Sequence, residues 1–403
     1  MNAHSIARRP DSVSLNCQKR ETLNANSIRF ETITTLERFE SLREEWNALW
    51  VRASGIHNLS FEYCLHSLKE VALPDGAELC SVVAWKGQQL VLAWPLLRER
   101  EMLWRSIRAL APDSSVPSDI LVEPGPEHNE LFAGAWKLLH SGKRADLLNL
   151  PYVRAGTQLH ALASKVRAKG RAEPLEIAVV RRARWTDWES LRQSLPSKSR
   201  KDLDSCNRRL AKLGRVTVSI VNPAETSGNS LIDYLFDWKK KWAEKTGRQG
   251  NFFAPRIRNF AVSLLRDPRT SGQFLLFALS VDDVPVAVNL VAVEKTCVRG
   301  MQAAFDDAYG KYTPGAILLE HVVKWAFDSN RDFDFGAGGG KYKSVWAGES
   351  SYASTDFRMA TSQWGKLAFV LADVRRWYRA YKSAPARKGA PVAGSPLRTD
   401  LEP

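Results

Sequence analysis

Two similar segments that lie almost half the chain apart constrain the fold more than any other feature. Residues 85–93, WKGQQLVLA, are the end of an apolar strand, a short polar turn and the start of a second apolar strand. Residues 281–288, VDDVPVAV, have the same form, and Lys86 lies 196 positions before Asp282 in a chain of 403 residues. A β-hairpin at matching positions indicates that the chain contains two related halves.

Strand patterns and helix patterns alternate in both halves. Strands or strand-like apolar runs are expected at residues 28–33, 79–85, 90–97, 102–110, 145–150, 175–180, 215–221, 273–281, 285–294, 297–304 and 332–335. Helices are expected at residues 37–52, 61–72, 130–141, 185–195, 198–213, 230–246, 256–266, 314–328 and 363–381. This order predicts an α/β (α+β) fold with two domains, residues 28–174 and 175–382, each a mixed central sheet flanked by helices. Disordered tails are expected at residues 1–27 and 383–403, where the composition is polar or rich in Pro, Gly and small residues.

The charge balance limits the kinds of partner. The chain has 58 Lys and Arg against 44 Asp and Glu, a net charge of +14, which favours acidic partners such as phosphate groups, nucleic acid or anionic headgroups. Its five Cys are scattered without a CxxC pair, which fits reduced thiols and argues against a zinc cluster, so no metal is expected. No apolar stretch approaches the roughly 20 residues that cross a bilayer. Residues 1–20 lack the apolar core of a secretory signal, so a cytoplasmic protein without a membrane span is expected.

The first segment that could carry chemistry is DDAYGKYTPGAI, residues 306–317. Thr313 is suited to cap a helix that begins at Pro314. Gly315 and Ala316 then present backbone N–H groups at the positive end of the helix dipole, and Lys311 adds charge, so a phosphate or pyrophosphate fits there. The alternative is a well-capped helix with an ordinary loop in front of it.

The second segment is RDFDFGAGGGKYKSVWAG, residues 331–348. A short strand that ends near Asp334 leads into a glycine run that matches neither a Walker A loop nor GxGxxG. Lys343, Tyr342 and Trp346 follow the glycines and suit the binding of a charged substrate beside an apolar wall. The alternative is a mobile surface loop.

Two further segments are basic. Arg208, Arg209 and Lys212 lie close together on the expected helix 198–213 and form either an anion-steering rim or a solvated basic face. In WKKKW, residues 238–242, the tryptophans are expected to form a buried stripe with the lysines in water, and nucleic-acid stacking is the minority interpretation.

Together these motifs resemble a known family. They are SxxRKxLxxxxRRLxKLG (197–214), WxxxW with a following glycine (238–247), FF (252–253), FALSVDDVPVAVNL (277–290), YTPGAILLE (312–320), FDFGAGG (333–339) and YKSVW (342–346). Their order and spacing resemble the GNAT-fold acyltransferases of the Fem-like group, in the branch described as CelD-like or cellulose-biosynthesis-associated acetyltransferases. The resemblance covers residues 180–360 well and 28–150 loosely, and it implies two tandem GNAT domains.

The resemblance also implies acyl transfer from a thioester or an aminoacyl-tRNA to an amine or hydroxyl group. The pyrophosphate of acetyl-CoA or another acyl-CoA would bind at the helix start, on Lys311, Tyr312, Thr313, Gly315 and Ala316. The Phe-Lys pair of Fem-type transferases is matched by Tyr342 and Lys343, with Tyr in place of Phe.

Acyl transfer requires an oriented nucleophile, the removal of one proton and the stabilisation of an oxyanion. Lys343 is expected to stabilise negative charge, and Asp334 ranks ahead of Asp306 and Asp307 as the base. Tyr309 or Tyr342 would protonate the leaving thiolate. The predicted substrate-binding residues are Arg208, Arg209, Lys212 and Trp346.

Three functions remain open at this point. The first is an N- or O-acyltransferase of envelope or exopolysaccharide metabolism that acts on a small-molecule or glycan acceptor. The second is a Fem-type aminoacyl transferase that uses charged tRNA, which the net charge of +14 suits because phosphate contacts give affinity. The third is a non-catalytic accessory protein that binds a polysaccharide synthase or its glycan, with some of the 14 tryptophans as stacking platforms.

Overall fold

The structure is a computed structural model that describes residues 27–113, 116–140, 145–166, 170–224, 229–247, 254–338 and 340–383. The tails predicted at 1–27 and 383–403 lie outside the described residues except for their innermost positions, and so does the FF motif at 252–253.

Strands and helices alternate along the whole described chain, as the sequence predicts. We call residues 28–180 the first repeat; its elements are β1 (Ile28–Ile33), α1 (Leu36–Glu40), α2 (Arg43–Arg52), η1 (His57–Leu59), α3 (Phe61–Ser67), η2 (Leu68–Ala72), β2 (Glu78–Leu79), β3 (Ser81–Lys86), β4 (Gln89–Trp94), β5 (Leu96–Glu101), β6 (Trp104–Ala109), β7 (Leu121–Val122), α4 (His128–His140), β8 (Leu147–Arg154), α5 (Gln158–Val166) and β9 (Gly170–Val180). A connection follows, with η4 (Arg182–Arg184), α6 (Trp188–Ser194) and α7 (Ser197–Leu210).

We call residues 216–360 the second repeat. Its elements are β10 (Val216–Val221), α8 (Asn229–Thr246), α9 (Pro255–Arg266), η6 (Pro268–Thr270), β11 (Phe274–Val281), β12 (Val284–Val293), β13 (Cys297–Phe305), η7 (Asp307–Tyr312), α10 (Pro314–Asp328), β14 (Asp332–Asp334), α11 (Lys341–Ala347) and β15 (Ser351–Ala360). The helix α12 (Gln363–Ser383) ends the described chain.

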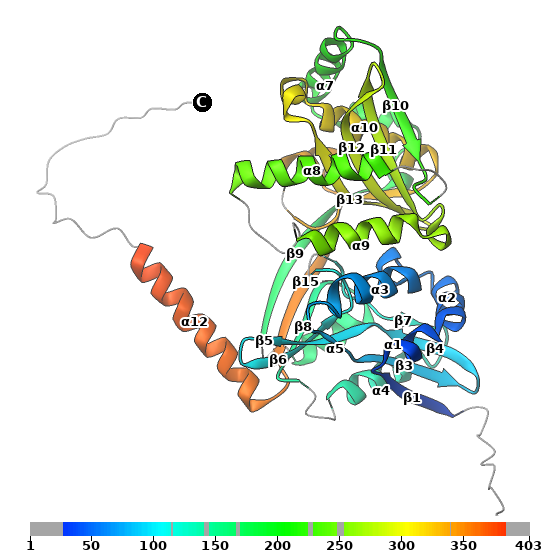
Figure 1. The fold of residues 1–403 in the computed structure, drawn as a ribbon, viewed down its shortest axis with the longest axis vertical. Coiled ribbons are helices and arrows are strands. Elements are labelled where there is room, and N and C mark those ends of the chain that lie inside the picture. Colours follow the sequence, from blue (N-terminus) through cyan, green and yellow to red (C-terminus); the bar gives the residue numbers. More distant parts are fainter. Residues whose placement is uncertain are drawn as a thin grey trace, which may run out of the picture.

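The strands form one small sheet and one large mixed sheet. The small sheet has the order β1-β3-β4-β7, and the large one has the order β10-β11-β12-β13-β14-β9-β15-β8-β6-β5-β2. Both hairpins that the sequence pairs are present and antiparallel, β3 with β4 and β11 with β12. Helices flank the large sheet, which confirms the predicted fold class (Figure 1).

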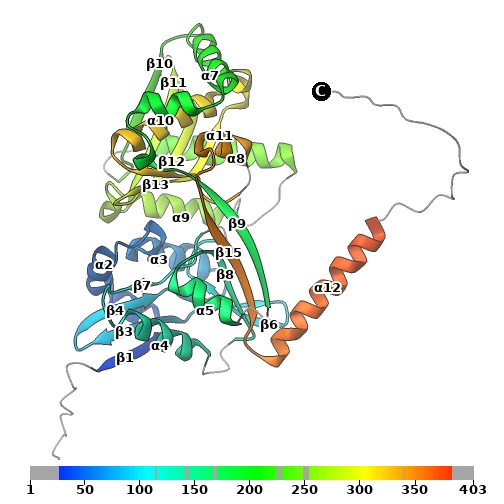
Figure 2. The same cartoon turned by 180° about the vertical axis from the view of Figure 1, so that it is seen from behind.

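The two repeats follow the same path and exchange their last strands. In the first repeat β6 and β8 are parallel and α4 connects them; in the second β13 and β14 are parallel and α10 connects them. The next strand of each repeat then pairs with the other repeat, β9 with β14 and β15 with β8. Because β9 and β15 also pair with each other, the two repeats share one continuous sheet, and the ribbon of these two strands joins the two bodies in Figures 1 and 2.

Two sequence predictions meet a different local structure. The expected helix 37–52 is interrupted after Glu40. The Ser41 hydroxyl donates to the Arg38 carbonyl oxygen at 2.8 Å, and the Leu42 N–H donates to the Phe39 carbonyl oxygen at 3.0 Å and not to that of Arg38. The strand β9 runs across the expected boundary between residues 174 and 175, and the division into domains at that point remains a prediction.

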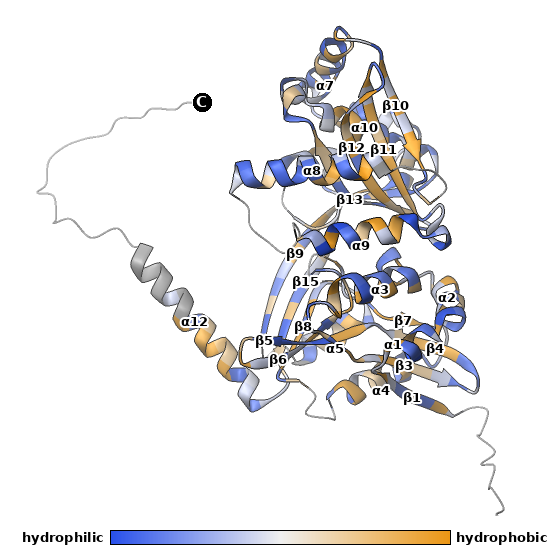
Figure 3. Ribbon diagram, viewed as in Figure 1, coloured by the Kyte–Doolittle hydropathy of each residue, from blue (hydrophilic) through white to orange (hydrophobic). Residues whose placement is uncertain are grey.

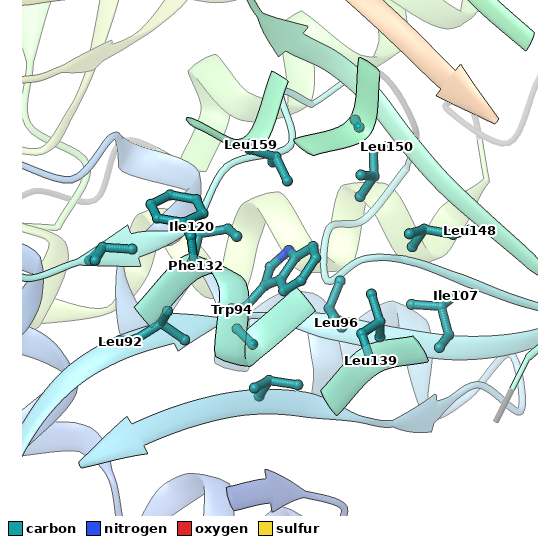
Figure 4. Packing of buried hydrophobic residues seen from close by; sticks show 14 of the residues in the cluster. Leu92, Trp94, Leu96, Ile107, Ile120, Phe132, Leu139, Leu148, Leu150 and Leu159 are labelled. Atoms are coloured by element: carbon teal, nitrogen blue, oxygen red, sulfur yellow. The ribbon is translucent and has the colours of Figure 1, made fainter. Parts of the chain in front are cut away.

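One core cluster of the first repeat lies between strands of both sheets and the helices α4 and α5, and a second lies between the small sheet and the helices α1, α2 and α3. Trp94, which is 1% exposed, lies among leucine and isoleucine side chains from β4, β5, β6 and β8 (Figure 4). Dense packing of this kind fixes the strands of the first repeat against which β15 pairs. In the second repeat, α10 packs on one cluster of apolar side chains and α8 and α9 on another.

The helix α12 leaves the body of the molecule and points away from it (Figures 1 and 2). No helix in the described ranges is both long enough and apolar enough to cross a membrane.

Candidate active site

The strands β13 and β14 separate soon after they meet. Their pairing covers only three residue pairs, from Cys297 with Asp332 to Arg299 with Asp334. Met301 is then an extra residue in β13, because Gly300 is opposite Val291 and Gln302 is opposite Leu290 in the neighbouring strand β12. A bulge of this kind bends a strand. The second half of β13 therefore runs past the end of β14. On the side away from β12, this half of β13 does not pair with β14, and we call it the unpaired edge of β13.

The helix α10 begins at the end of this edge. Gly315 lies against the ring of Phe305, the last residue of β13, and a Cβ at this position would come within 3.1 Å of the ring. Pro314 is the first residue of the helix, as predicted. A glycine in the first turn lets the helix terminus approach β13 closely, so that the positive end of the dipole lies beside the separated strands.

Two details of this helix terminus differ from the prediction. Thr313 has φ +50° and makes no capping hydrogen bond with its side chain, because the chain turns in a left-handed conformation there. The N–H of Ala316 is also not free, since it donates to the Thr313 carbonyl oxygen at 3.0 Å. Gly315 and Lys311 remain consistent with the predicted phosphate site.

The structure brings together predicted residues from two distant segments. Arg209 at the end of α7 lies 5.4 Å from the ring centroid of Tyr312, and Lys311 lies 5.1 Å from the same ring. Arg209 and Lys311 are exposed, and this pair of cations stands immediately before α10. Arg208 and Lys212 are exposed as well, but α7 ends at Leu210, so Lys212 lies in the following turn rather than on the helix.

Lys343 holds the glycine segment that follows β14. Its ammonium group donates to three backbone carbonyl oxygens, those of Phe335 (3.0 Å), Gly336 (3.0 Å) and Ala337 (2.8 Å). Burial and the charge of Lys239 lower the pKa of Lys343, and the charge of Asp334 opposes them. Because all three protons of the ammonium group have acceptors, the side chain fixes the segment beside the separated strands. The residues around it, 341–347, form the short helix α11, which differs from the alternative interpretation of this segment as a mobile loop.

Asp334 is engaged on both carboxylate oxygens. It is 2% exposed and accepts hydrogen bonds from Arg299 Nη1 (2.6 Å), the Tyr352 hydroxyl (2.8 Å) and the Gly336 N–H (2.7 Å). Burial and the charge of Asp334 raise the pKa of Tyr352 to about 12. A carboxylate with three donors is poorly placed to accept a further proton from a substrate, so this geometry does not support the prediction that Asp334 is the base.

The same network continues to the first repeat. Glu294 Oε1 lies 3.6 Å from Arg299 Nε and accepts from the backbone N–H of His57 (3.2 Å), and His57 Nδ1 lies 2.9 Å from it. Burial alone would raise the pKa of Glu294, but the hydrogen bond to His57 and the charge of Arg299 hold it at about 2. A buried chain of charges therefore connects η1 with the point where β13 and β14 separate.

The other predicted site residues lie in different surroundings. Tyr342 is 53% exposed, with its ring edge toward Phe335. Tyr309 is half-buried and packs on the apolar cluster under α10. Trp346 is 5% exposed and stacks on Trp188 in the core, so this placement does not support its predicted contact with substrate.

Sequence reasoning missed Lys239. The lysines of WKKKW were expected in water, but Lys239 Nζ lies 3.4 Å from the carbonyl oxygen of Ala303, on the unpaired edge of β13, and 4.7 Å from the centroid of the Trp242 ring. Arg299, Glu294, His57 and Tyr352 were missed as well, because their contacts join segments that are far apart in the chain. Within the described ranges, no three His, Cys, Asp or Glu side chains are grouped so that they could hold a metal ion.

Comparisons with known proteins bear on the fold of the chain. Residues 197–344 match the family model described as an acetyltransferase (GNAT) domain. No curated protein matches the chain in sequence. Among solved structures, FemX is 12% identical with a TM-score of 0.52, and the match covers 82% of this chain and 96% of that one.

Two other solved structures are similar over the same extent. L-PGS from Bacillus licheniformis is 10% identical with a TM-score of 0.49, and the match covers 83% of this chain and 96% of that one. A tandem GNAT protein from the clavulanic acid biosynthesis pathway is 13% identical with a TM-score of 0.46, and the match covers 83% and 99%. Residues 197–344 thus match a GNAT acetyltransferase domain model, and the fold of the chain is similar to that of FemX.

Proposed function

We propose that the protein is an acyltransferase that moves an acetyl or other acyl group from acyl-CoA to an amine or hydroxyl acceptor in envelope or exopolysaccharide metabolism. One observation carries this proposal: the unpaired edge of β13 leads to the N-terminus of α10, with Lys239 beside Ala303 on that edge and Lys311 just before the helix. An extended thioester arm with a diphosphate at one end matches a strand edge that ends in positive charge.

In this proposal the diphosphate of acyl-CoA binds at the start of α10. Gly315 lets the start of α10 lie close against Phe305 at the end of β13, and Lys311 and Arg209 supply positive charge beside Tyr312. Tyr312, Thr313 and Ala316 complete the surface of that turn. The arm of the donor then lies along β13, with the thioester near Lys239 and the segment held by Lys343.

The reaction needs no residue to form a covalent bond. The acceptor nitrogen or oxygen attacks the thioester carbonyl carbon, the new C–N or C–O bond forms, and the C–S bond breaks. The acceptor releases one proton to water, and the leaving thiolate gains one from a tyrosine that water then reprotonates. Lys343 contributes a fixed positive charge and the shape of residues 335–337, while the exposed Tyr342 or the half-buried Tyr309 donates the proton to the thiolate.

The donor site can be tested by calorimetric titration of acetyl-CoA. We expect the Arg209→Ala and Lys311→Ala variants to bind about tenfold more weakly than wild type, since a charge-assisted contact contributes about 1.5 kcal/mol or more. Lys198→Ala is a matched control, because this exposed lysine lies about 16 Å from Arg209 at the other end of α7. Equal affinities for all four proteins, or no binding of any acyl-CoA, would contradict the proposal.

A Fem-type transferase that uses aminoacyl-tRNA is the second candidate. The basic end of α7 and the turn after it, where Arg208, Arg209 and Lys212 are exposed, favour it. A gel shift with aminoacyl-tRNA at 50 and 200 mM salt separates the two, because several phosphate contacts make affinity fall steeply with salt. If only aminoacyl-tRNA binds, the second candidate replaces the first; if only a glycan binds and no acyl group is transferred, the protein is a non-catalytic accessory factor.

A further inference from the structure

The helix α12 has an exposed apolar face. Six large apolar side chains along it are between 44% and 67% exposed: Trp364, Leu367, Val370, Leu371, Val374 and Trp377. At 100° per residue they fall within about 140° of the helix circumference. Figure 3 shows apolar residues along the described part of this helix that adjoins the body.

This face does not belong to the side of α12 that packs on the protein. Gly365, opposite this face, and Ala368, just outside it next to Trp364, are buried, and Gly365 is so close to the backbone that a Cβ would lie 2.0 Å from the Asp146 carbonyl oxygen. Ala368 packs in a small cluster with Trp104 and Leu147. The packed side holds the first half of α12 in place and leaves the apolar face directed outward.

The apolar surface extends beyond α12 to the turn between β5 and β6. Met102 and Leu103 in that turn are 55% and 62% exposed. The Trp364 indole N–H donates to the Leu103 carbonyl oxygen at 3.3 Å, so the turn and the start of the helix lie side by side. A contiguous exposed apolar surface of this extent indicates a partner or a membrane.

Charge decides which partner this surface fits. The sequence of α12 contains five Lys and Arg against one Asp, a net charge of +4, in a chain whose own net charge is +14. A helix that combines an apolar face rich in Trp and Leu with an excess of Lys and Arg is typical of helices that lie in the surface of a bilayer. Pairing with α12 of a second copy fits this surface less well. It would place two helices of charge +4 side by side, and the apolar face is wider than the contact surface of a helix in a two-stranded coiled coil.

We propose that α12, together with the turn at Met102 and Leu103, docks the protein on a bilayer surface that carries anionic headgroups. The helix lies in the plane of the surface with its outward face among the acyl chains, and it does not cross the bilayer. This surface does not include the site at β13 and β14, so the proposal does not depend on the proposed acyl transfer.

Flotation of the full chain with vesicles tests the proposal. Vesicles of phosphatidylcholine alone are compared with vesicles that contain 30 mol% phosphatidylglycerol, at low and high salt. We expect wild type to float with the anionic vesicles, about tenfold less with the neutral ones, and less at high salt.

The triple variant Val370→Asn, Leu371→Asn, Val374→Asn is expected to lose about tenfold or more of this binding, since its apolar face can no longer insert. The matched control replaces three exposed apolar residues outside α12, Val51→Asn, Ile220→Asn and Val284→Asn. Urea unfolding confirms that both variants are folded.

Equal binding by the two triple variants, or no binding by wild type, overturns the proposal. Light scattering without vesicles provides the other decisive result. A stable dimer that the α12 variant dissociates would show that a second copy covers this face and would also overturn the proposal. Unchanged acetyl-CoA affinity in the α12 variant is expected, which keeps this result independent of the test of acyl transfer.

Discussion

His57 Nδ1 lies 2.9 Å from Glu294 Oε1, and this contact joins the first repeat to the second through two side chains that are 6% and 9% exposed. Glu294 also faces Arg299, so its carboxylate contacts both a residue of the first repeat and a residue of the second. We predict that Glu294→Gln destabilises the fold by about 3 kcal/mol, because it leaves buried donors without a charged acceptor. Urea unfolding measures the change, and Glu349→Gln, at an exposed position, is expected to alter stability by less than about 0.5 kcal/mol.

The lowered pKa of Glu294 makes the free energy of unfolding depend on pH. The pKa of Glu294 is lowered from 4.5 to about 2 in the folded protein, so the stabilisation it gives is complete above pH 4.5 and is lost as the pH falls toward 2. A shift of this size corresponds to about 3 kcal/mol. The difference in unfolding free energy between wild type and Glu294→Gln should therefore shrink between pH 5 and pH 3; a difference that stays constant would contradict the assignment.

Lys343 is predicted to fix residues 335–337 as well as to supply charge. In Lys343→Met the three carbonyl oxygens lose their donor, so the amide of Gly336 should exchange about tenfold faster in hydrogen-exchange mass spectrometry. Turnover should fall in parallel. Lys343→Arg is expected to restore part of both, and Lys341→Met, at an exposed neighbouring lysine, neither lowers turnover nor speeds exchange.

Much of this arrangement is predictable from the sequence, because local patterns determine it. The hairpin repeat identifies two related halves, and Pro314 correctly marks the start of α10. The strand β15 is missed because its sequence, SYASTDFRMA, shows apolar alternation only at Phe357 and Met359. It forms a strand because β8 and β9 pair with it on its two sides. A local sequence pattern does not reveal pairing partners that are distant in the chain.

The site is predicted less well, for a related reason. Asp334 is correctly placed beside the glycine segment, but its role depends on Arg299, which is 35 residues away, and on Tyr352. Contacts of long sequence separation carry no periodic signal. Lys239 is another example, because its position on α8 does not reveal that its side chain contacts the Ala303 carbonyl oxygen of β13.

Gly336 is predicted to be intolerant of a side chain. It has φ +67°, and a Cβ would lie 3.2 Å from the Gly300 carbonyl oxygen, where β13 and β14 begin to separate. Gly336→Ala should cost about 1–2 kcal/mol and weaken acetyl-CoA binding, because it adds strain and pushes β13. Gly156→Ala is the control, since φ is +84° there with open space around it, and it should lower stability without changing affinity.

The exchange of strands between the repeats predicts that neither repeat folds alone. Residues 1–213 lack β15, which pairs with both β8 and β9, and residues 214–403 lack β9, which pairs with β14. Each fragment would thus expose a long unpaired strand edge and part of its core. We expect circular dichroism to show little cooperative structure in either fragment. Co-expressed fragments should purify together, and both they and the intact chain are expected to unfold in one transition. Two outcomes would contradict this prediction: fragments that fold separately, or an intact chain that unfolds in two well-separated steps. Either one would mean that β9 and β15 connect two independent domains and are not the centre of a single sheet.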